Sequence, residues 1–411
     1  MLATRYPETH HMPRILHTAD WHLGKRLHDF RLLDEQRQAL ERLLAVVDAE
    51  APDLVLVAGD VFDVPVPPVG ALQLWAWIAG QIVDERGVPL VVIPGNHDSA
   101  ERIAMNAQVA RRAGLFVLNT LAAAHVAVRI AGVDVLGVPF HKPPHVRALA
   151  AGSDEADAAA PAPAEIGDFD YDAAMAWLLV RARERRDPNV PTVLAAHAYV
   201  AGAGAEDEGE DPLMVGGAGA VMPRTLAGFD YVALGHLHAP RALPGHRSVR
   251  YAGSLYPYAF GEANAKSVTI VDLAGDVGAA PEIRSVPLRA ERQVRLIEGV
   301  TFADAIDQGL RARTAGDPRV DDYLLLRVSD RGPIDHALSR LREVYPHALL
   351  EQPVVDVHLD ARRLPGDART LSVEDAFLAF YDHVTGAAPS ELEREILREA
   401  LSADDSESAS V

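Results

Sequence analysis

The chain has 411 residues, of which 49% are hydrophobic, and its formal net charge at pH 7 is −20. This length predicts two or three domains, and the acidic balance argues against a surface that is uniformly built to bind nucleic acid. The sequence contains no cysteine, which excludes disulfides and thiolate metal sites. It shows no run of eighteen uncharged apolar residues and no apolar signal-peptide core, so we expect a cytoplasmic protein.

Strands and helices alternate along the first part of the chain. Short apolar runs predict strands at 14–19, 53–58, 89–95, 115–118, 125–130 and 133–138. Apolar residues at helical spacing predict helices at 34–50, 70–87 and 99–114. Gly87 is expected to end the second helix and Ser99 to cap the third. The segments 151–167 and 200–220 are rich in small or acidic residues and are predicted to be loops.

The second part continues the alternation and then changes character near residue 288. A helix is predicted at 170–186, followed by strands at 192–196, 231–235, 249–254 and 266–273. A small α/β module follows, with elements at 323–328, 333–345 and 353–359, and then two helices at 372–384 and 390–402. We therefore expect an α/β (α+β) protein with a first domain at 12–287, a second at 288–365, C-terminal helices at 370–402 and an acidic disordered tail at 403–411.

Metal-binding side chains follow five of the predicted strands. They are Asp20, His22, Asp60, Asp63, Asn96, His97, Asp98, His197, His236 and His238. Strand ends are where α/β proteins place their sites, and the D-x-H and H-x-H spacings turn both side chains the same way. One ion with an open position needs three or four protein ligands, so this set favours two ions that share a carboxylate. Ligands without sulfur suit Mn, Fe or Zn better than Ca.

Each of these motifs is weak on its own. A D-x-H after a strand is common by chance, G-N-H-D is an ordinary turn composition, and G-H-L-H could be a pair of core residues. The five motifs together indicate one shared metal site. His17 lies one strand step inside the first motif and is expected to be a buried core histidine. The remaining candidates, His10, His11, His28 and His246, are expected on the surface.

The motifs "ILHTADWHLGK", "AGDVFD", "PGNHDS", "FDYVALGHLHAP" and "YAGSLYPYAFGE" resemble the calcineurin-like metallophosphoesterases, and among them the SbcD branch of bacterial nuclease subunits. The resemblance implies a β-sandwich flanked by helices, a small α/β capping domain and C-terminal helices. It implies two ions, most often Mn²⁺, with Fe or Zn as alternatives. The first ion would be held by Asp20, His22, Asp60 and His238. The second would be held by Asp60, Asn96, His197 and His236.

The resemblance also implies catalytic roles for two further residues. His97 would face the scissile phosphate and stabilise its charge or protonate the leaving 3′ oxygen, and Asp63 would orient and charge His97. The implied activity is metal-dependent hydrolysis of phosphodiester bonds at double-strand DNA ends and hairpins, in DNA repair, recombination and replication.

The resemblance further implies partners. An SbcC-type ATPase with a coiled coil would gate access of duplex DNA, and the catalytic subunit would form a homodimer within a heterotetramer. The predicted docking residues are Phe377, Leu378, Phe380 and Tyr381, which could alternatively pack on the capping domain. Predicted DNA contacts are Lys25, Arg26 and Lys142, each of which could also be an ordinary surface charge.

Two other classes of function remain open. The chain could be a metallophosphoesterase that acts on phosphoproteins, nucleotides or other small phosphodiesters. Protein phosphatases of this kind carry G-N-H-E and an arginine after the G-D-x-x-D aspartate, whereas this chain has Asp98 and Val64 at those places. A scaffold with a decayed site is the other class, and the complete set of ligands argues against it.

Overall fold

The computed structural model describes residues 12–152, 169–204, 219–262, 264–274, 277–330, 332–353, 372–385, 388–391 and 393–396. The chain forms two compact units. The first contains residues 1–327 and 335–351, and the second contains residues 328–334 and 352–411. Among the described helices, none combines the length and the apolar character needed to cross a membrane.

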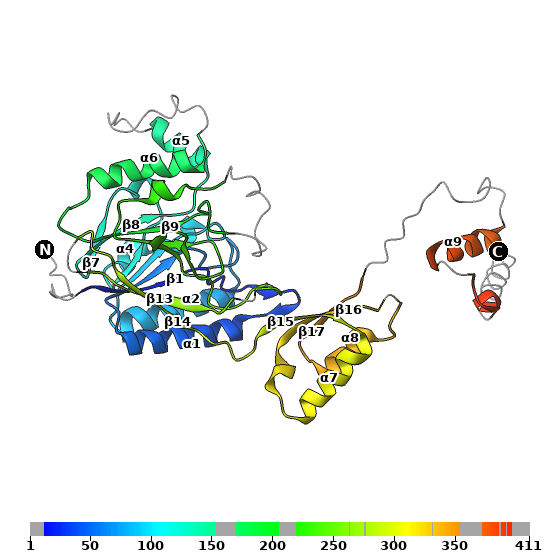
Figure 1. Cartoon of the computed structure of the whole chain (residues 1–411). Coiled ribbons are helices and arrows are strands. Elements are labelled where there is room, and N and C mark those ends of the chain that lie inside the picture. Colours follow the sequence, from blue (N-terminus) through cyan, green and yellow to red (C-terminus); the bar gives the residue numbers. More distant parts are fainter. Residues whose placement is uncertain are drawn as a thin grey trace. The chain divides into compact units, whose positions relative to one another are not determined.

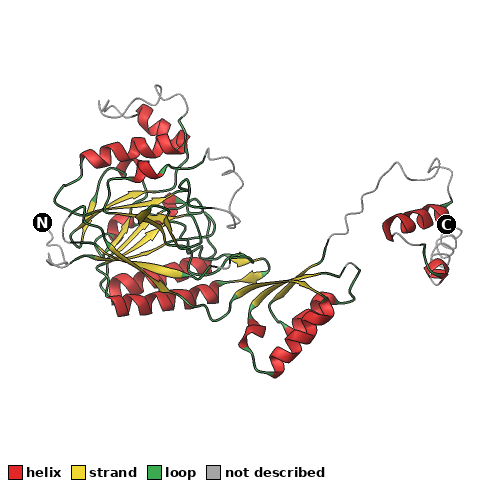
Figure 2. Ribbon diagram, viewed as in Figure 1, coloured by secondary structure: helices red, strands yellow, loops and turns green. Residues whose placement is uncertain are grey.

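Two six-stranded sheets build the sandwich of the first unit, which confirms the predicted α/β class and architecture (Figure 2). One sheet has the order β14 (Glu282–Pro287), β13 (Ser267–Asp272), β1 (Arg14–Thr18), β4 (Leu54–Ala58), β5 (Leu90–Ile93) and β6 (Leu115–Val117). The other has the order β11 (Arg241–Leu243), β12 (His246–Tyr251), β10 (Tyr231–Gly235), β9 (Thr192–His197), β8 (Val133–Val138) and β7 (Val128–Ile130). The central strands of each sheet are parallel, so their carboxyl ends meet at one edge.

The central strands are buried on both faces, which explains their continuous apolar runs. Ile15 and Leu56 face the second sheet, where they meet Val193 and Tyr231. Leu16 and Val55 face outward. The outer faces are covered by α1 (Leu33–Glu50) and α2 (Val69–Gly80) on one sheet and by α5 (Pro143–Gly152) and α6 (Tyr171–Glu184) on the other (Figure 1).

Most predicted elements of the sandwich are confirmed, with one clear error. The helix predicted at 99–114 is two short helices, α3 (Ala100–Ile103) and α4 (Ala107–Ala110). The predicted cap is present, because the Ser99 side chain accepts a hydrogen bond from the Arg102 amide. Asn106 has φ 64°, a left-handed backbone that a right-handed helix cannot continue through. The helix predicted at 70–87 is present as α2, and a π-helical turn at Gln81–Glu85 follows it directly.

Several elements were not predicted. They are the hairpin of β2 (Arg26–Leu27) and β3 (Phe30–Arg31), strands β11, β14, β15 (Val294–Val300) and β17 (Ala348–Glu351), helices α5 and α7 (Phe302–Thr314), and the short turns Leu121–Ala123, Pro223–Leu226 and Pro318–Asp321. Most of them span six residues or fewer, which is too short to show a periodic pattern of apolar residues. The predicted loops at 151–167 and 200–220 and the strand at 353–359 fall mostly or wholly outside the described residues, and the tail at 403–411 lies outside them entirely.

A small module follows the sandwich within the first unit, and we call it the cap. Its three strands are β15 (Val294–Val300), β16 (Tyr323–Val328) and β17 (Ala348–Glu351), with helices α7 (Phe302–Thr314) and α8 (Ala337–Val344). A buried cluster joins it to the sandwich: Leu27, Leu32, Tyr256, Tyr258 and Tyr323. The second unit contains α9 (Val373–Thr385), as predicted, while most of the helix predicted at 390–402 lies outside the described residues. The predicted domain bounds at 287 and 365 stay a prediction.

Candidate metal centre

The strand ends carry their polar residues in an unusual backbone conformation. Asp20, His22 and Asp60 have φ values of 52°, 44° and 51°, and His236 has φ 107°. Residues with a side chain rarely adopt such values, and backbone strain of this kind concentrates at functional sites. The turns after β1, β4 and β10 therefore place these four side chains at one edge of the sandwich at an energetic cost.

Two glycines let these turns pack against each other. A side chain on Gly95 would collide with the carboxylate and the amide of Asp60, and one on Gly235 would collide with the carbonyl of Ala58. This close approach explains why the G-N-H-D and G-H-L-H motifs begin with glycine.

Asp60 lies at the centre of the site. Its Oδ1 accepts a hydrogen bond from the amide of His97 at 2.9 Å. Its Oδ2 is buried, lies 3.3 Å from Nε2 of His197 and 3.7 Å from Nε2 of His22, and makes no hydrogen bond with any described residue. A buried carboxylate oxygen in this position calls for a cation. The residues around Asp60 therefore fit a metal centre.

Two imidazoles meet on one side of Asp60. Nε2 of His22 lies 3.1 Å from Nε2 of His238. Nδ1 of His238 donates to Oε1 of Glu262 at 3.2 Å, so its Nε2 is the unprotonated nitrogen, ready to bind a metal. Asp20 lies in the same buried region, where its Oδ1 accepts from the amide of His236 at 2.9 Å.

Three further predicted ligands meet on the other side of Asp60. Oδ1 of Asn96 lies 2.9 Å from Nε2 of His197 and 3.1 Å from Nδ1 of His236. Nδ1 of His197 donates to the carbonyl of Ala58 at 2.9 Å, which fixes the ring and leaves Nε2 for a ligand role. The seven predicted ligands are thus brought together. Two groups have all their ligand atoms within 4.8 Å of one another: Asp20, Asp60 and His197, and His22, Asp60 and His97.

The charges of the site are strongly coupled. Burial alone lowers the pKa of His197, but the negative charges of Asp60 and Asp20 outweigh it and raise that pKa to about 10. Burial alone raises the pKa of Asp60, but the facing imidazoles, His197 first, hold it far below its usual range. The carboxylate thus stays ionised and attracts whatever cation is present, so protons and metal ions compete for the same place.

His97 is held by the main chain of Asp63. Its Nδ1 donates to the carbonyl of Asp63 at 2.8 Å, and its ring packs edge-on against that of His22 with centroids 4.7 Å apart. The carboxylate of Asp63 instead binds Nζ of Lys25 at 2.8 Å and lies 3.4 Å from Nδ1 of His22. Burial raises the pKa of Asp63, but these two partners lower it to about 2. Asp63 thus contacts His97 through its carbonyl, while its carboxylate faces Lys25 and His22, and its predicted role toward His97 stays a prediction.

Residues that sequence reasoning missed support the ligands. Glu262 accepts from His238 and, through Oε2, from Nζ of Lys266 at 2.6 Å, and the same Nζ donates to the carbonyl of His238 at 3.1 Å. Burial raises the pKa of Glu262, but its hydrogen bond with His238 and the charge of Lys266 lower it to about 2. The one signal in the sequence was an acid four residues before a lysine, at the end of the "GSLYPYAFGE" motif.

Two more supports hold the loops in place. Gln36 on α1 donates to the carbonyl of His22 at 2.7 Å and accepts from the amide of Gly24 at 2.9 Å. Asp98 accepts from the amides of Val61, Phe62 and Gly95 at 2.9–3.1 Å. The carboxylate of Asp98, the last residue of the G-N-H-D motif, therefore ties two of the ligand loops together.

The predicted DNA contacts lie in different segments of the first unit, and the predicted partner contacts lie on α9 of the second unit. Lys25 is half-buried beside Asp63, while Arg26 is exposed in β2 and Lys142 is exposed just before α5. Phe377 and Phe380 on α9 of the second unit are 42% and 50% exposed, and Tyr381 is half-buried. These residues, with Leu378, stay predictions.

The histidines predicted to lie outside the site are placed as expected where the structure describes them. His17 is fully buried, and its Nδ1 lies 2.9 Å from the hydroxyl of Tyr231. His28 and His246 are exposed, while His10 and His11 lie outside the described residues.

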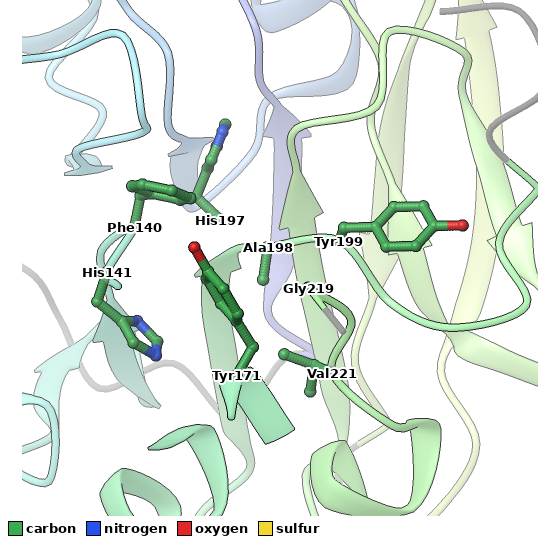
Figure 3. Close-up of a pocket in the computed structure, with 8 residues that line it drawn as sticks. All are labelled: Phe140, His141, Tyr171, His197, Ala198, Tyr199, Gly219 and Val221. Atoms are coloured by element: carbon green, nitrogen blue, oxygen red, sulfur yellow. The ribbon is translucent and has the colours of Figure 1, made fainter. Parts of the chain in front are cut away.

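A small cavity backs the ring of His197. It has room for about one water at most, with a volume near 10 Å³, and its lining includes Phe140, His141, Tyr171 and Val221. Figure 3 shows the ring of His197 pointing away from Tyr171 and Val221. The rings of Phe140 and His197 pack edge-on, with centroids 6.3 Å apart. The cavity is thus packing behind a ligand rather than a substrate site.

Known proteins resemble this chain over most of its length. Residues 13–240 match the family described as calcineurin-like phosphoesterase. The chain is 33% identical to the SbcD subunit of the nuclease SbcCD of Bacillus subtilis (strain 168) over 395 residues, covering 91% of this chain and 94% of that protein. It is 28% identical to the SbcD subunit of the same nuclease in Staphylococcus saprophyticus over 375 residues, covering 91% and 93%. The chain therefore belongs to the calcineurin-like phosphoesterase family and, within it, to the family of SbcD nuclease subunits.

Proposed function

We propose that this chain hydrolyses phosphodiester bonds at double-strand DNA ends and hairpins, as the nuclease subunit that works with an SbcC-type ATPase in DNA repair and recombination. One observation carries the proposal: Oδ2 of Asp60 lies 3.3 Å from Nε2 of His197 and 3.7 Å from Nε2 of His22. A carboxylate between two ligand groups suits a bridge between two ions. The family is one of metal-dependent hydrolases, and the names of the relatives support DNA and an SbcC-type partner.

The residues divide into two ligand sets around Asp60. The first set is Asp20, His22, Asp60 and His238, and the second is Asp60, Asn96, His197 and His236. This mixture of imidazole, carboxylate and amide, without sulfur, favours Mn²⁺, with Fe or Zn as alternatives. When bound, such ions polarise the phosphate and lower the pKa of water to make a nucleophile at neutral pH.

His97 serves as the proton donor in this proposal. Its Nδ1 proton is committed to the carbonyl of Asp63, so Nε2 is the atom that can hold or release a proton toward the substrate. Its amide is tied to Oδ1 of Asp60, which fixes the distance between the proton donor and the bridging carboxylate. We therefore assign protonation of the leaving 3′ oxygen to Nε2 of His97.

The cap, the second unit and the partner belong to the DNA part of the proposal. The chain covers 94% and 93% of the length of the two relatives. We place the partner's docking surface on α9, through Phe377, Leu378, Phe380 and Tyr381, and expect the chain to act as a dimer in a heterotetramer.

The test is degradation of linear double-stranded DNA with manganese. The chain is assayed alone and with its SbcC-type partner and ATP, and in both settings the wild type is compared with His97→Ala and with the exposed-histidine control His246→Ala. We expect partner and ATP to raise duplex cleavage, His97→Ala to abolish it while metal still binds, and His246→Ala to behave as wild type. Hydrolysis of a small chromogenic phosphodiester with DNA untouched in every mixture contradicts the DNA assignment and favours a phosphoesterase for nucleotides or other small phosphodiesters.

A further inference from the structure

A groove of about 350 Å³ lies between the β2–β3 hairpin and the cap. The hairpin contributes Arg26 and His28, and the segment after β12 contributes Tyr258 and Phe260. The cap contributes Arg327 from β16 and Glu351 from β17, strands labelled in Figure 1. None of these residues belongs to the proposed ligand sets.

Tyr258 is a wall shared by the groove and the metal centre. Its ring centroid lies 5.6 Å from that of His22 and 5.9 Å from that of His238. The ring is fixed, because its hydroxyl bonds the carbonyl of Trp21 and receives a hydrogen bond from Gln36. A molecule in the groove is therefore separated from the first ligand set by the width of one side chain.

The groove carries one positive charge that is not neutralised. The guanidinium of Arg26 donates to the main-chain carbonyls of His28 and Asp29, at 3.5 and 3.0 Å, and has no carboxylate partner among the described residues. Arg327, in contrast, is bound by Glu351 at 2.7 Å and Glu298 at 3.4 Å. An exposed guanidinium without an acidic partner suits a phosphate.

Next to Arg26 the groove offers an aromatic surface. The rings of His28 and Phe260 lie 5.7 Å apart at an angle of 38°. His28 is exposed and Phe260 is half-buried, so both rings are accessible from the groove. Aromatic side chains of this kind stack on nucleic-acid bases with little regard to their identity.

We propose that this groove binds one unpaired nucleotide of the DNA strand that is cut, with its base against Phe260 and its phosphate on Arg26. The inference rests on the proposed function and adds to it a subsite for a single nucleotide. The groove lies at the small end of ligand pockets, about 300–1,000 Å³, and a duplex, with a major groove alone about 12 Å wide, does not fit it. Frayed ends and hairpin loops supply such unpaired nucleotides.

The experiment uses the full chain with manganese and a twelve-nucleotide oligothymidylate. The groove variants are Phe260→Ala and Arg26→Gln, and Arg247→Gln, an exposed arginine on β12, is the charge-matched control. We expect each groove variant to raise KM by about five- to tenfold, the order of one lost base stack or phosphate contact, and Arg247→Gln to leave KM unchanged. Thermal unfolding of each variant reports whether it folds.

A second series separates a nucleotide site from a merely structural role. Oligonucleotides with one abasic position, moved along the strand, are tested with the wild type and Phe260→Ala. At one position near the cut, the missing base and the missing ring should act on the same contact, so their effects on KM do not multiply. Effects that multiply at every position overturn the proposal. Competition by free thymidine monophosphate as strong as that by the oligonucleotide points to a free-nucleotide site and overturns it as well.

Hydrolysis of bis(p-nitrophenyl) phosphate by the wild type tells the two proposals apart. If the small diester and the oligonucleotide are both cut but the groove variants match Arg247→Gln, the groove inference is wrong and the proposed function stands. If the small diester is cut while the oligonucleotide is neither cut nor bound, the DNA assignment fails and the groove inference fails with it.

Discussion

Nε2 of His22 and Nε2 of His238 lie 3.1 Å apart, although the two residues are 216 positions apart in the chain. His22 follows β1 in one sheet and His238 follows β10 in the other. The contact exists only when both sheets are packed together. The candidate metal centre is therefore a junction of the sandwich, and metal binding is coupled to folding.

Removal of metal should lower stability for this reason. We expect Mn²⁺ at about a hundredfold excess over its dissociation constant to stabilise the folded chain by about 2.7 kcal/mol relative to the protein in chelator. Unfolding in urea, monitored by tryptophan fluorescence with and without Mn²⁺, measures the difference. Equal midpoints in the two conditions contradict the idea that the ligands form a site only in the folded chain.

Asp60→Asn should remove activity with little change in the fold. Asparagine keeps an oxygen for the amide of His97 but loses the charge on the atom that faces His197 and His22. Mutation of a residue that only hydrogen-bonds a metal ligand typically lowers metal affinity or activity by about 10- to 100-fold. We therefore expect this ligand variant to lose more than about 100-fold in phosphodiester hydrolysis. The control is Asp84→Asn, an exposed aspartate in the turn after α2. Retained activity in Asp60→Asn argues against a bridging role.

The grouping of the predicted ligands could be foreseen from the sequence, because each of these residues follows an apolar run and has a side chain that can bind a metal. The parallel order of β1, β4, β5, β9 and β10 then brings those run ends to one edge, as the α/β pattern requires. The two-sheet sandwich came from the resemblance, since alternation alone does not say how strands divide between sheets.

The supports of the site could not be predicted, because they depend on contacts that no local pattern encodes. Glu262 reaches His238 across 24 positions, and Gln36 reaches Tyr258 across 222. Main-chain contacts are equally hidden, because no pattern in the sequence shows that the carbonyl of Asp63 accepts a hydrogen bond from Nδ1 of His97. Asn106 interrupts a segment whose apolar residues are otherwise at helical spacing, because one residue with a left-handed backbone is enough to end a right-handed helix.

Glu262→Gln should weaken metal binding rather than the chemical step. The carboxylate fixes the tautomer of His238, so its loss should lower Mn²⁺ affinity by about 10- to 100-fold while kcat at saturating Mn²⁺ stays within a few-fold. Titration of activity with Mn²⁺ and calorimetric binding separate the two effects. A fall in kcat with unchanged Mn²⁺ affinity contradicts the positioning role.

The buried His17 predicts a pH dependence of stability. Burial, with a smaller effect of the charge of Arg250, lowers its pKa from 6.5 to about 3 in the folded chain. The unfolded chain therefore binds the extra proton between about pH 6.5 and pH 3, so stability is highest above that window and falls as the pH falls through it. Within this window, one such group lowers the free energy of unfolding by about 1.4 kcal/mol for each unit that the pH falls.

Urea unfolding at pH 6 and pH 4 tests this contribution. His17→Leu should remove about 2 to 3 kcal/mol of the loss between these two pH values. The exposed-residue control His246→Gln should follow the wild type. If His17→Leu shows the same loss as the wild type, other groups account for the acid sensitivity.

A buried ion pair connects the cap to the sandwich. Glu35 on α1 is 5% exposed, and its Oε1 accepts from Arg292 and from the hydroxyl of Tyr323, the latter at 2.9 Å. Arg292 also binds Asp321 of the cap at 2.6 Å. Arg292→Met leaves the charge of Glu35 buried beside an apolar side chain. We expect this variant to lower the free energy of unfolding by about 2 to 4 kcal/mol. The loss should be smaller than for a fully buried pair, because Arg292 is 27% exposed.

The double variant Glu35→Gln with Arg292→Met tests whether the two residues act as a pair. Because it removes the stranded charge together with its partner, it should be more stable than Arg292→Met alone. An exposed pair on α7, Asp307 with Arg311, is the control, and Arg311→Met should change stability by less than about 1 kcal/mol. The single variant Glu35→Gln completes the comparison. If the double variant loses as much stability as Arg292→Met and Glu35→Gln added together, Glu35 and Arg292 stabilise the junction independently, and the cap is held mainly by the apolar contacts of Tyr256 and Tyr323.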